Sequence, residues 1–166
     1  MKNSKKIVLM GHFGVGKTSL FRRFIDDEFS EDYKVTLGVQ IKKKSVQLPD
    51  GTRVSLIFWD TEGHIHIEDT RRSYLLGSDA FIYVCDVSRA ETFVSLNEDI
   101  VYLKDNHPDV PIKSIGNKID LIEEKQQLFE LFEKHQVSMD ILTSAKTNEN
   151  VQTLLMEIST EVSSEN

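Results

Sequence analysis

The residues with the clearest chemical potential lie at positions 11–18, which read GHFGVGKT and fit the pattern G-x-x-x-x-G-K-[ST]. Glycines in this pattern let the backbone curl so that successive N–H groups point at phosphate oxygens. Lys17 is long enough to reach terminal phosphates, and the hydroxyl of Thr18 is suited to Mg²⁺. The spacing therefore predicts a site for a polyphosphate and its metal ion.

A second metal-binding position is Asp60, which ends an apolar run and begins the sequence DTEGH. In proteins with such a loop, a carboxylate after a later strand holds the Mg²⁺ that bridges the β- and γ-phosphates. A surface Asp-x-x-Gly turn is the alternative interpretation of this short pattern. Its place downstream of the loop and after an apolar strand favours the metal-binding interpretation.

The sequence NKID at 117–120 indicates which base would be bound. The two oxygens of the Asp120 carboxylate can accept hydrogen bonds from the ring N–H and the exocyclic amine of guanine, whereas adenine offers no such pair. Sites that depend on such bonds discriminate by roughly 10⁴ or more. We expect Lys118 to cover a face of the purine and Asn117 to tie neighbouring loops together. Backbone N–H groups would close the base pocket from Ser144, Ala145 and Lys146.

Short strands precede all of these residues, and helices separate them. An apolar run, Lys6–Met10, leads into the loop, and Ser19–Ile25 follows it with apolar residues at helical spacing. Asp-Gly at 50–51 predicts a hairpin. Further strands are expected at 39–48, 53–59, 81–85, 111–115 and 138–142, and further helices at 91–104, 123–135 (with Leu128, Phe129 and Phe132 on its inner face) and after 150.

This alternation predicts an α/β fold of the P-loop NTPase type. The sheet is expected to have six mostly parallel strands, one antiparallel edge strand, and helices on both faces. Ligands of such sheets bind beyond the carboxyl ends of the strands. All the motifs should therefore meet at one edge of the sheet.

Composition narrows the functional classes. The chain has 166 residues, which fits one domain, and a net charge of −7, which disfavours nucleic acid as a partner. The lysines at 42–44 are interpreted as the solvated part of a strand. A lone cysteine, Cys85, indicates a reducing compartment, so we expect a cytoplasmic location. With no span-length apolar segment and no cysteine near the C-terminus, we expect no autonomous membrane anchor; a longer lipidated tail is left open.

The order of these motifs resembles the small GTPases of the Ras superfamily. The segments TLGV at 36–39, FWDT at 58–61 and DVSRAETF at 86–93 resemble the Rab branch. The resemblance extends from about Lys5 to about Thr160. It implies one small GTPase (G) domain over residues 1–166, which hydrolyses GTP to GDP and phosphate and acts as a molecular switch.

The resemblance also implies roles for individual residues. Phe29 would pack against the guanine, Thr36 would join Mg²⁺ and sense the γ-phosphate, and Gly63 would donate its N–H to that phosphate. Two switch loops, about 29–38 (with Tyr33) and 60–76, would bind effectors, exchange factors and activating proteins, the chain itself being a monomer. The nucleotide GTP or GDP would contact Gly14, Val15, Gly16, Lys17, Thr18, Ser19, Phe29, Thr36, Gly63, Asn117, Lys118, Asp120, Ser144, Ala145 and Lys146, and Mg²⁺ would contact Thr18, Thr36 and Asp60.

Three positions depart from the common family pattern. His64 stands where most relatives have a glutamine that orients water; a neutral imidazole can do the same, so we expect His64 and Lys17 to be catalytic, an inert surface histidine being the alternative. Glu62 would repel the γ-phosphate by about 1–4 kcal/mol at close range. Phe13 would crowd an arginine supplied by an activator. A metal cluster around His64 and His66 is disfavoured, because Mg²⁺ prefers oxygen ligands.

These departures leave two functional hypotheses. The first is a switch enzyme with slow intrinsic hydrolysis, and the second is a guanine-nucleotide-binding scaffold with strongly impaired hydrolysis. A third class, a nucleotide kinase with the same loop, would not explain the sequence NKID.

Overall fold

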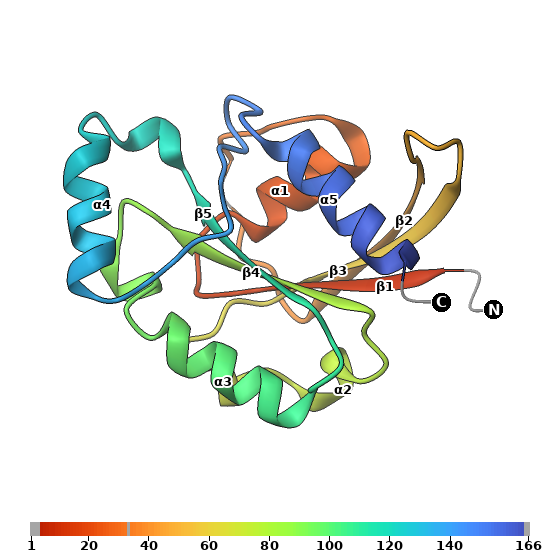
Figure 1. The fold of residues 1–166 in the computed structure, drawn as a ribbon, viewed down its shortest axis with the longest axis horizontal. Coiled ribbons are helices and arrows are strands. Elements are labelled where there is room, and N and C mark those ends of the chain that lie inside the picture. The colour runs from red at the N-terminus through yellow and green to blue at the C-terminus, as the bar shows by residue number, and fades with distance from the viewer. Residues whose placement is uncertain (1–3, 33, 165–166) are drawn as a thin grey trace.

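The protein is an α/β sandwich with one six-stranded sheet at its centre (Figure 1). The computed structural model describes residues 4–32 and 34–164, so Tyr33, expected in the first switch, lies outside the described residues. The strand order is β2-β3-β1-β4-β5-β6. The strands are β1 (Lys5–Met10), β2 (Val39–Gln47), β3 (Arg53–Thr61), β4 (Ala80–Asp86), β5 (Ile112–Asn117) and β6 (Ile141–Leu142).

The pairing of the strands confirms the predicted sheet. β1 runs parallel to β3 and β4, β4 to β5, and β5 to β6. Only β2 is antiparallel among the described strands, with Val39 opposite Thr61 and Gln47 opposite Arg53. In the β2–β3 turn, the N–H of Thr52 donates to the Asp50 carboxylate over 2.8 Å, which fixes the hairpin expected from Asp-Gly.

Helices cover both faces of the sheet. In Figure 1, α1 and α5 lie above it and α2 and α3 below. Within the described ranges, three short 3-10 turns connect the longer elements. The helices are α1 (Lys17–Asp26), α2 (Arg72–Leu75), α3 (Leu96–Asn106), α4 (Lys125–Lys134) and α5 (Val151–Ser164), and the turns are η1 (Ile67–Asp69), η2 (Ala90–Thr92) and η3 (Ile119–Leu121). In the described part of the chain, no helix is long and apolar enough to cross a membrane.

The apolar strands separate two cores. Along β1, Ile7 and Leu9 join the cluster that α1 and α5 complete. Val8 and Met10 point to the other face, into the cluster that α3 and α4 complete. Because both faces are covered, β4 is buried along its whole length. The two cores hold the carboxyl ends of the central strands at one edge.

Three expectations are wrong in detail. The helix expected over 91–104 is divided into η2 and α3, because the hydroxyl of Thr92 bonds the backbone at the end of β4 instead of allowing a continuous helix. Phe129 is 44% exposed rather than on the inner face of α4, whose buried stripe consists of Leu128 and Phe132. The last strand spans only Ile141–Leu142.

Candidate functional site

A cavity of about 270 Å³ lies at the carboxyl edge of the sheet. The segments that line it come from both ends of the chain. Its lining includes Gly14, Gly16, Lys17, Thr18, Ser19, Phe29, Thr36, Gly63, Asn117, Lys118, Asp120, Ala145 and Lys146, all of which the sequence analysis singled out. Val15, Asp60, His64 and Ser144 were also singled out, but they lie behind this lining, all buried.

The loop at 11–18 connects β1 to α1 and has a backbone that only glycine allows at one point. Gly16 has φ 102°, and a Cβ there would lie 2.2 Å from Nδ2 of Asn117. The absence of a side chain at Gly16 lets Asn117 come close to the loop, where its Nδ2 donates to the Val15 carbonyl over 3.0 Å. The loop and β5 are therefore held against each other.

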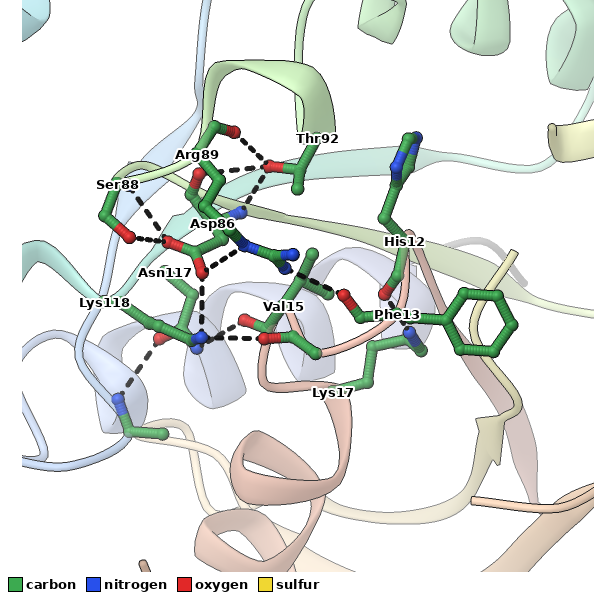
Figure 2. A network of polar contacts seen from close by, with 12 residues as sticks. His12, Phe13, Val15, Lys17, Asp86, Ser88, Arg89, Thr92, Asn117 and Lys118 are labelled. Carbon is green, nitrogen blue, oxygen red and sulfur yellow. Dashed lines mark hydrogen bonds and ion pairs between the residues drawn. The ribbon is translucent and has the colours of Figure 1, made fainter. Parts of the chain in front are cut away.

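Side chains also hold the other carbonyls of this loop (Figure 2). Nζ of Lys17 donates to the carbonyls of Gly11 and His12 over 2.9 and 2.7 Å. Nζ of Lys118 donates to the Gly14 carbonyl over 2.7 Å. Carbonyls engaged in this way are kept from facing a bound anion, so the loop can offer N–H groups to it.

The buried charge beside the loop favours an anion. The Lys17 residue is only 6% exposed, and burial lowers its pKa to about 8, although the nearby Asp60 acts in the opposite direction. A buried ammonium is costly unless a counter-charge faces it. A phosphate in the cavity would supply that counter-charge.

Three side chains with oxygen atoms suited to binding a metal ion lie close together near Lys17. The hydroxyl of Thr18 lies 2.7 Å from both the Thr36 hydroxyl and Oδ2 of Asp60. Asp60 is fully buried, and burial raises its pKa; its Oδ1 has no hydrogen-bond partner among the described residues. Hydroxyl and carboxylate oxygens with an unsatisfied buried atom fit Mg²⁺, which prefers such ligands.

At the other end of the cavity, hydrogen bonds fix the base-recognition residues. Oδ1 of Asp120 accepts from the Ser144 hydroxyl over 2.5 Å. The N–H of Ala145 donates to Oδ1 of Asn117 over 3.2 Å. The unusual positive φ of Lys118 (67°) turns its side chain back toward the loop. Ser144 thus holds the Asp120 carboxylate at the cavity wall through Oδ1, and the second oxygen, Oδ2, takes no part in this bond.

Sequence reasoning missed Arg23, which organises the segment at 144–146. Its Nε donates to the Ala145 carbonyl over 2.7 Å, and its Nη2 to the Lys146 carbonyl over 2.9 Å. Its guanidinium also lies 5.9 Å from the ring centroid of Phe29. No motif indicates such contacts, because they join side chains to backbone atoms of a distant segment.

His64 points into the protein rather than into the cavity. It is 3% exposed, and its ring centroid lies 5.7 Å from that of His12 and 6.0 Å from that of Tyr83. Burial, together with the charges of Lys17 and His12, lowers its pKa to about 3. Neither ring nitrogen has a hydrogen-bond partner among the described residues. The ring is thus neutral and would have to rotate outward to reach a bound phosphate.

Of the other two departures, Phe13 lines the cavity, whereas Glu62 is not part of its lining. Phe13 packs over Gly63, where a Cβ would lie 2.6 Å from Cα of Phe13. The Glu62 carboxylate accepts the Gly38 N–H over 3.2 Å and lies 3.6 Å from Nε of Arg71. Its charge therefore faces the segments around Gly38 and Arg71. Among residues 4–32 and 34–164, no group of three acidic, histidine or cysteine side chains could hold a metal ion.

This arrangement defines a P-loop nucleotide-binding protein of the α/β class. The model of the Ras family matches residues 6–164. Over 168 residues, the chain is 35% identical to the Ypt/Rab-type GTPase YPT7 of Saccharomyces cerevisiae, covering 95% of this chain and 80% of that protein. It is 36% identical over 160 residues to the Ras-related protein Rab-18-B of Danio rerio, covering 92% and 76%. The chain belongs to the Ras family, and it is a Rab-like small GTPase.

Proposed function

We propose that this GTP-binding switch protein binds GTP and GDP together with Mg²⁺ and hydrolyses GTP slowly by itself. One observation supports this most: Thr18, Thr36 and the buried Lys17 line the cavity that Asp120 also lines. Asp60, directly behind them, accepts a hydrogen bond from Thr18 and completes a cluster of three oxygen-bearing side chains. A nucleoside triphosphate needs the lysine and the oxygen cluster at one end of its site, for the phosphates, and a base-recognising carboxylate at the other end.

In this proposal, Lys17 and the loop N–H groups of residues 14–19 bind the phosphates, with the N-terminus of α1 adding its positive dipole end. The oxygens of Thr18, Thr36 and Asp60 hold Mg²⁺, which supplies charge neutralisation at the β- and γ-phosphates when it is bound. At the base end, Asp120 selects guanine, with Phe29, Asn117, Lys118, Ser144, Ala145 and Lys146 completing the pocket.

The two proposed switch segments, about 29–38 and 60–76, touch each other beside the metal residues. The N–H of Glu62 donates to the Gly38 carbonyl over 2.8 Å, and the Glu62 carboxylate accepts the Gly38 N–H. Thr36 and Gly63, one from each segment, line the same end of the cavity. Loss of the γ-phosphate would release both, so effectors, exchange factors and activators would distinguish the two states here.

For hydrolysis, we propose that Lys17 stabilises the developing charge and that His64 orients the water after leaving its inward position. The buried, unpartnered ring favours a slow intrinsic rate, since the outward state must first form. The same observation supports the second candidate, a scaffold with strongly impaired hydrolysis. Single-turnover phosphate release distinguishes the two candidates.

The test compares wild type with His64→Ala and with the control His66→Ala, an exposed neighbour. We expect measurable release from wild type, at least a tenfold decrease in His64→Ala and no change in His66→Ala. Equal rates in all three proteins would contradict the role of His64. No release from wild type, with GTP bound, would favour the scaffold.

We also propose that residues 1–166 form one G domain and that the chain is a cytoplasmic monomer. The single cysteine, Cys85, which is buried and free, supports a reducing compartment.

A further inference from the structure

Arg89 reaches the phosphate-binding loop from the segment after β4. Its Nη2 donates to the Phe13 carbonyl over 2.8 Å, although the two residues are 76 positions apart (Figure 2). With the bonds from Lys17, Lys118 and Asn117, side-chain donors engage each loop carbonyl from residue 11 to residue 15. Arg89 provides the contact at the middle of this series.

The head of Arg89 is fixed by a buried carboxylate. Its Nε donates to Oδ2 of Asp86 over 3.0 Å, and the same oxygen lies 2.8 Å from Nζ of Lys118. Oδ1 of Asp86 accepts from the backbone N–H and the hydroxyl of Ser88. Burial opposes the charge of Asp86, but the bonds from Lys118 and Ser88 outweigh it and lower its pKa. Asp86 is thus a charged, immobile anchor.

The backbone of Arg89 is fixed as well. Its N–H donates to the Asp86 carbonyl over 3.0 Å, and its carbonyl accepts from the Thr92 hydroxyl over 2.8 Å. The same hydroxyl accepts the Asp86 N–H over 2.9 Å. A long side chain fixed at both ends loses little further freedom when it bonds a third group, so its bond to Phe13 is pre-organised.

The geometry points to Arg89 as a positioning residue that holds the Phe13 peptide and links the base-binding lysine to the phosphate-binding loop through Asp86. This inference rests on the proposed function and extends it. Asp86 joins both cations, Lys118 bonds Gly14, and Arg89 bonds Phe13. Because the loop must keep its shape to hold phosphates, loss of the bond from Arg89 to the Phe13 carbonyl would weaken nucleotide retention. The Asp120 carboxylate, which is held by Ser144, would stay in place.

The test measures release of fluorescent GDP and hydrogen exchange of the loop amides. The variants are Arg89→Ala, Arg89→Lys, and the control Arg53→Ala, an exposed arginine at the start of β3. Since the Arg89 side chain is 39% exposed, we expect GDP release to be only about fivefold faster in Arg89→Ala. Arg89→Lys keeps the charge but cannot serve Asp86 and Phe13 as a fork, so its rate should be intermediate.

Exchange should accelerate in the peptide that contains residues 12–16 in Arg89→Ala and stay unchanged in Arg53→Ala. A GDP release rate within twofold of wild type, or faster exchange confined to 86–93, would overturn the inference, because Arg89 would then only stabilise its own turn. A wild-type protein that retains no guanine nucleotide would overturn the proposed function and the inference together.

Discussion

The inward position of His64 predicts an unusual dependence of stability on acid. Its folded-state pKa is about 3, compared with 6.5 for a free histidine, because burial disfavours the charged ring. Between these values, the unfolded chain binds a proton at His64 that the folded protein does not. The free energy of unfolding must therefore fall as pH decreases below 6.5.

The size of this effect follows from the pKa values. A pH of 5.0 is about 1.5 units below the pKa of the histidine in the unfolded chain, and each unit corresponds to about 1.36 kcal/mol of free energy. The penalty is about 2 kcal/mol at pH 5.0 and close to zero at pH 7.5. Replacing the ring by the uncharged amide of His64→Gln removes the penalty, whereas His66→Gln, at an exposed position, leaves it in place.

The assay is urea unfolding at pH 7.5 and at pH 5.0, with GDP and Mg²⁺ saturating in every sample. We expect the free energy of unfolding to decrease from pH 7.5 to pH 5.0 in both proteins. The decrease should be about 2 kcal/mol larger in wild type than in His64→Gln. An NMR titration of the five histidines gives the pKa values directly. Equal losses in the two proteins, or a His64 resonance that titrates near pH 6.5, would refute the buried position.

Three other substitutions test the site. Asp120→Asn should weaken GDP binding by roughly 10² or more and improve xanthosine diphosphate binding, because the amide offers a donor where the carboxylate offers an acceptor; competition assays measure this, and an unchanged preference would contradict base selection by Asp120. Phe13→Gly should respond more strongly than wild type to an activator that supplies an arginine, in stimulated phosphate release; equal responses would show that the ring does not obstruct it. Glu62→Gln keeps an acceptor for the Gly38 N–H but removes the charge, so GTP affinity or turnover should rise about two- to tenfold. No change in either quantity would show that Arg71 already neutralises Glu62.

The sequence predicted the sheet and many of the residues that line the cavity, and for a physical reason. The loop at 11–18 and the sequence NKID each come directly after an apolar strand, and parallel strands present their carboxyl ends at one edge. Gly16 could also be predicted from the local sequence, because the loop requires a positive φ at this position that disfavours residues other than glycine.

Contacts between distant segments could not be predicted in this way. Arg23 and Arg89 donate to backbone carbonyls of residues that are distant in the sequence. Every residue has a backbone carbonyl, so the sequence does not indicate which one an arginine will contact. The inward rotation of His64 depends on the space beside His12 and Tyr83, which exists only after β1 and β4 have packed. The broken helix at 91–104 likewise depends on the Thr92 hydroxyl finding the end of β4.

We propose above all that one cavity of this protein binds guanine nucleotide with Mg²⁺ and hydrolyses GTP. The most direct measurement analyses the nucleotide bound to purified protein and then follows GTP hydrolysis with Mg²⁺ and with the metal chelated. We predict bound GDP or GTP, slow phosphate release with Mg²⁺, and rapid nucleotide loss without it. Bound adenine nucleotide, or no guanine nucleotide retained at micromolar concentrations, would contradict the claim.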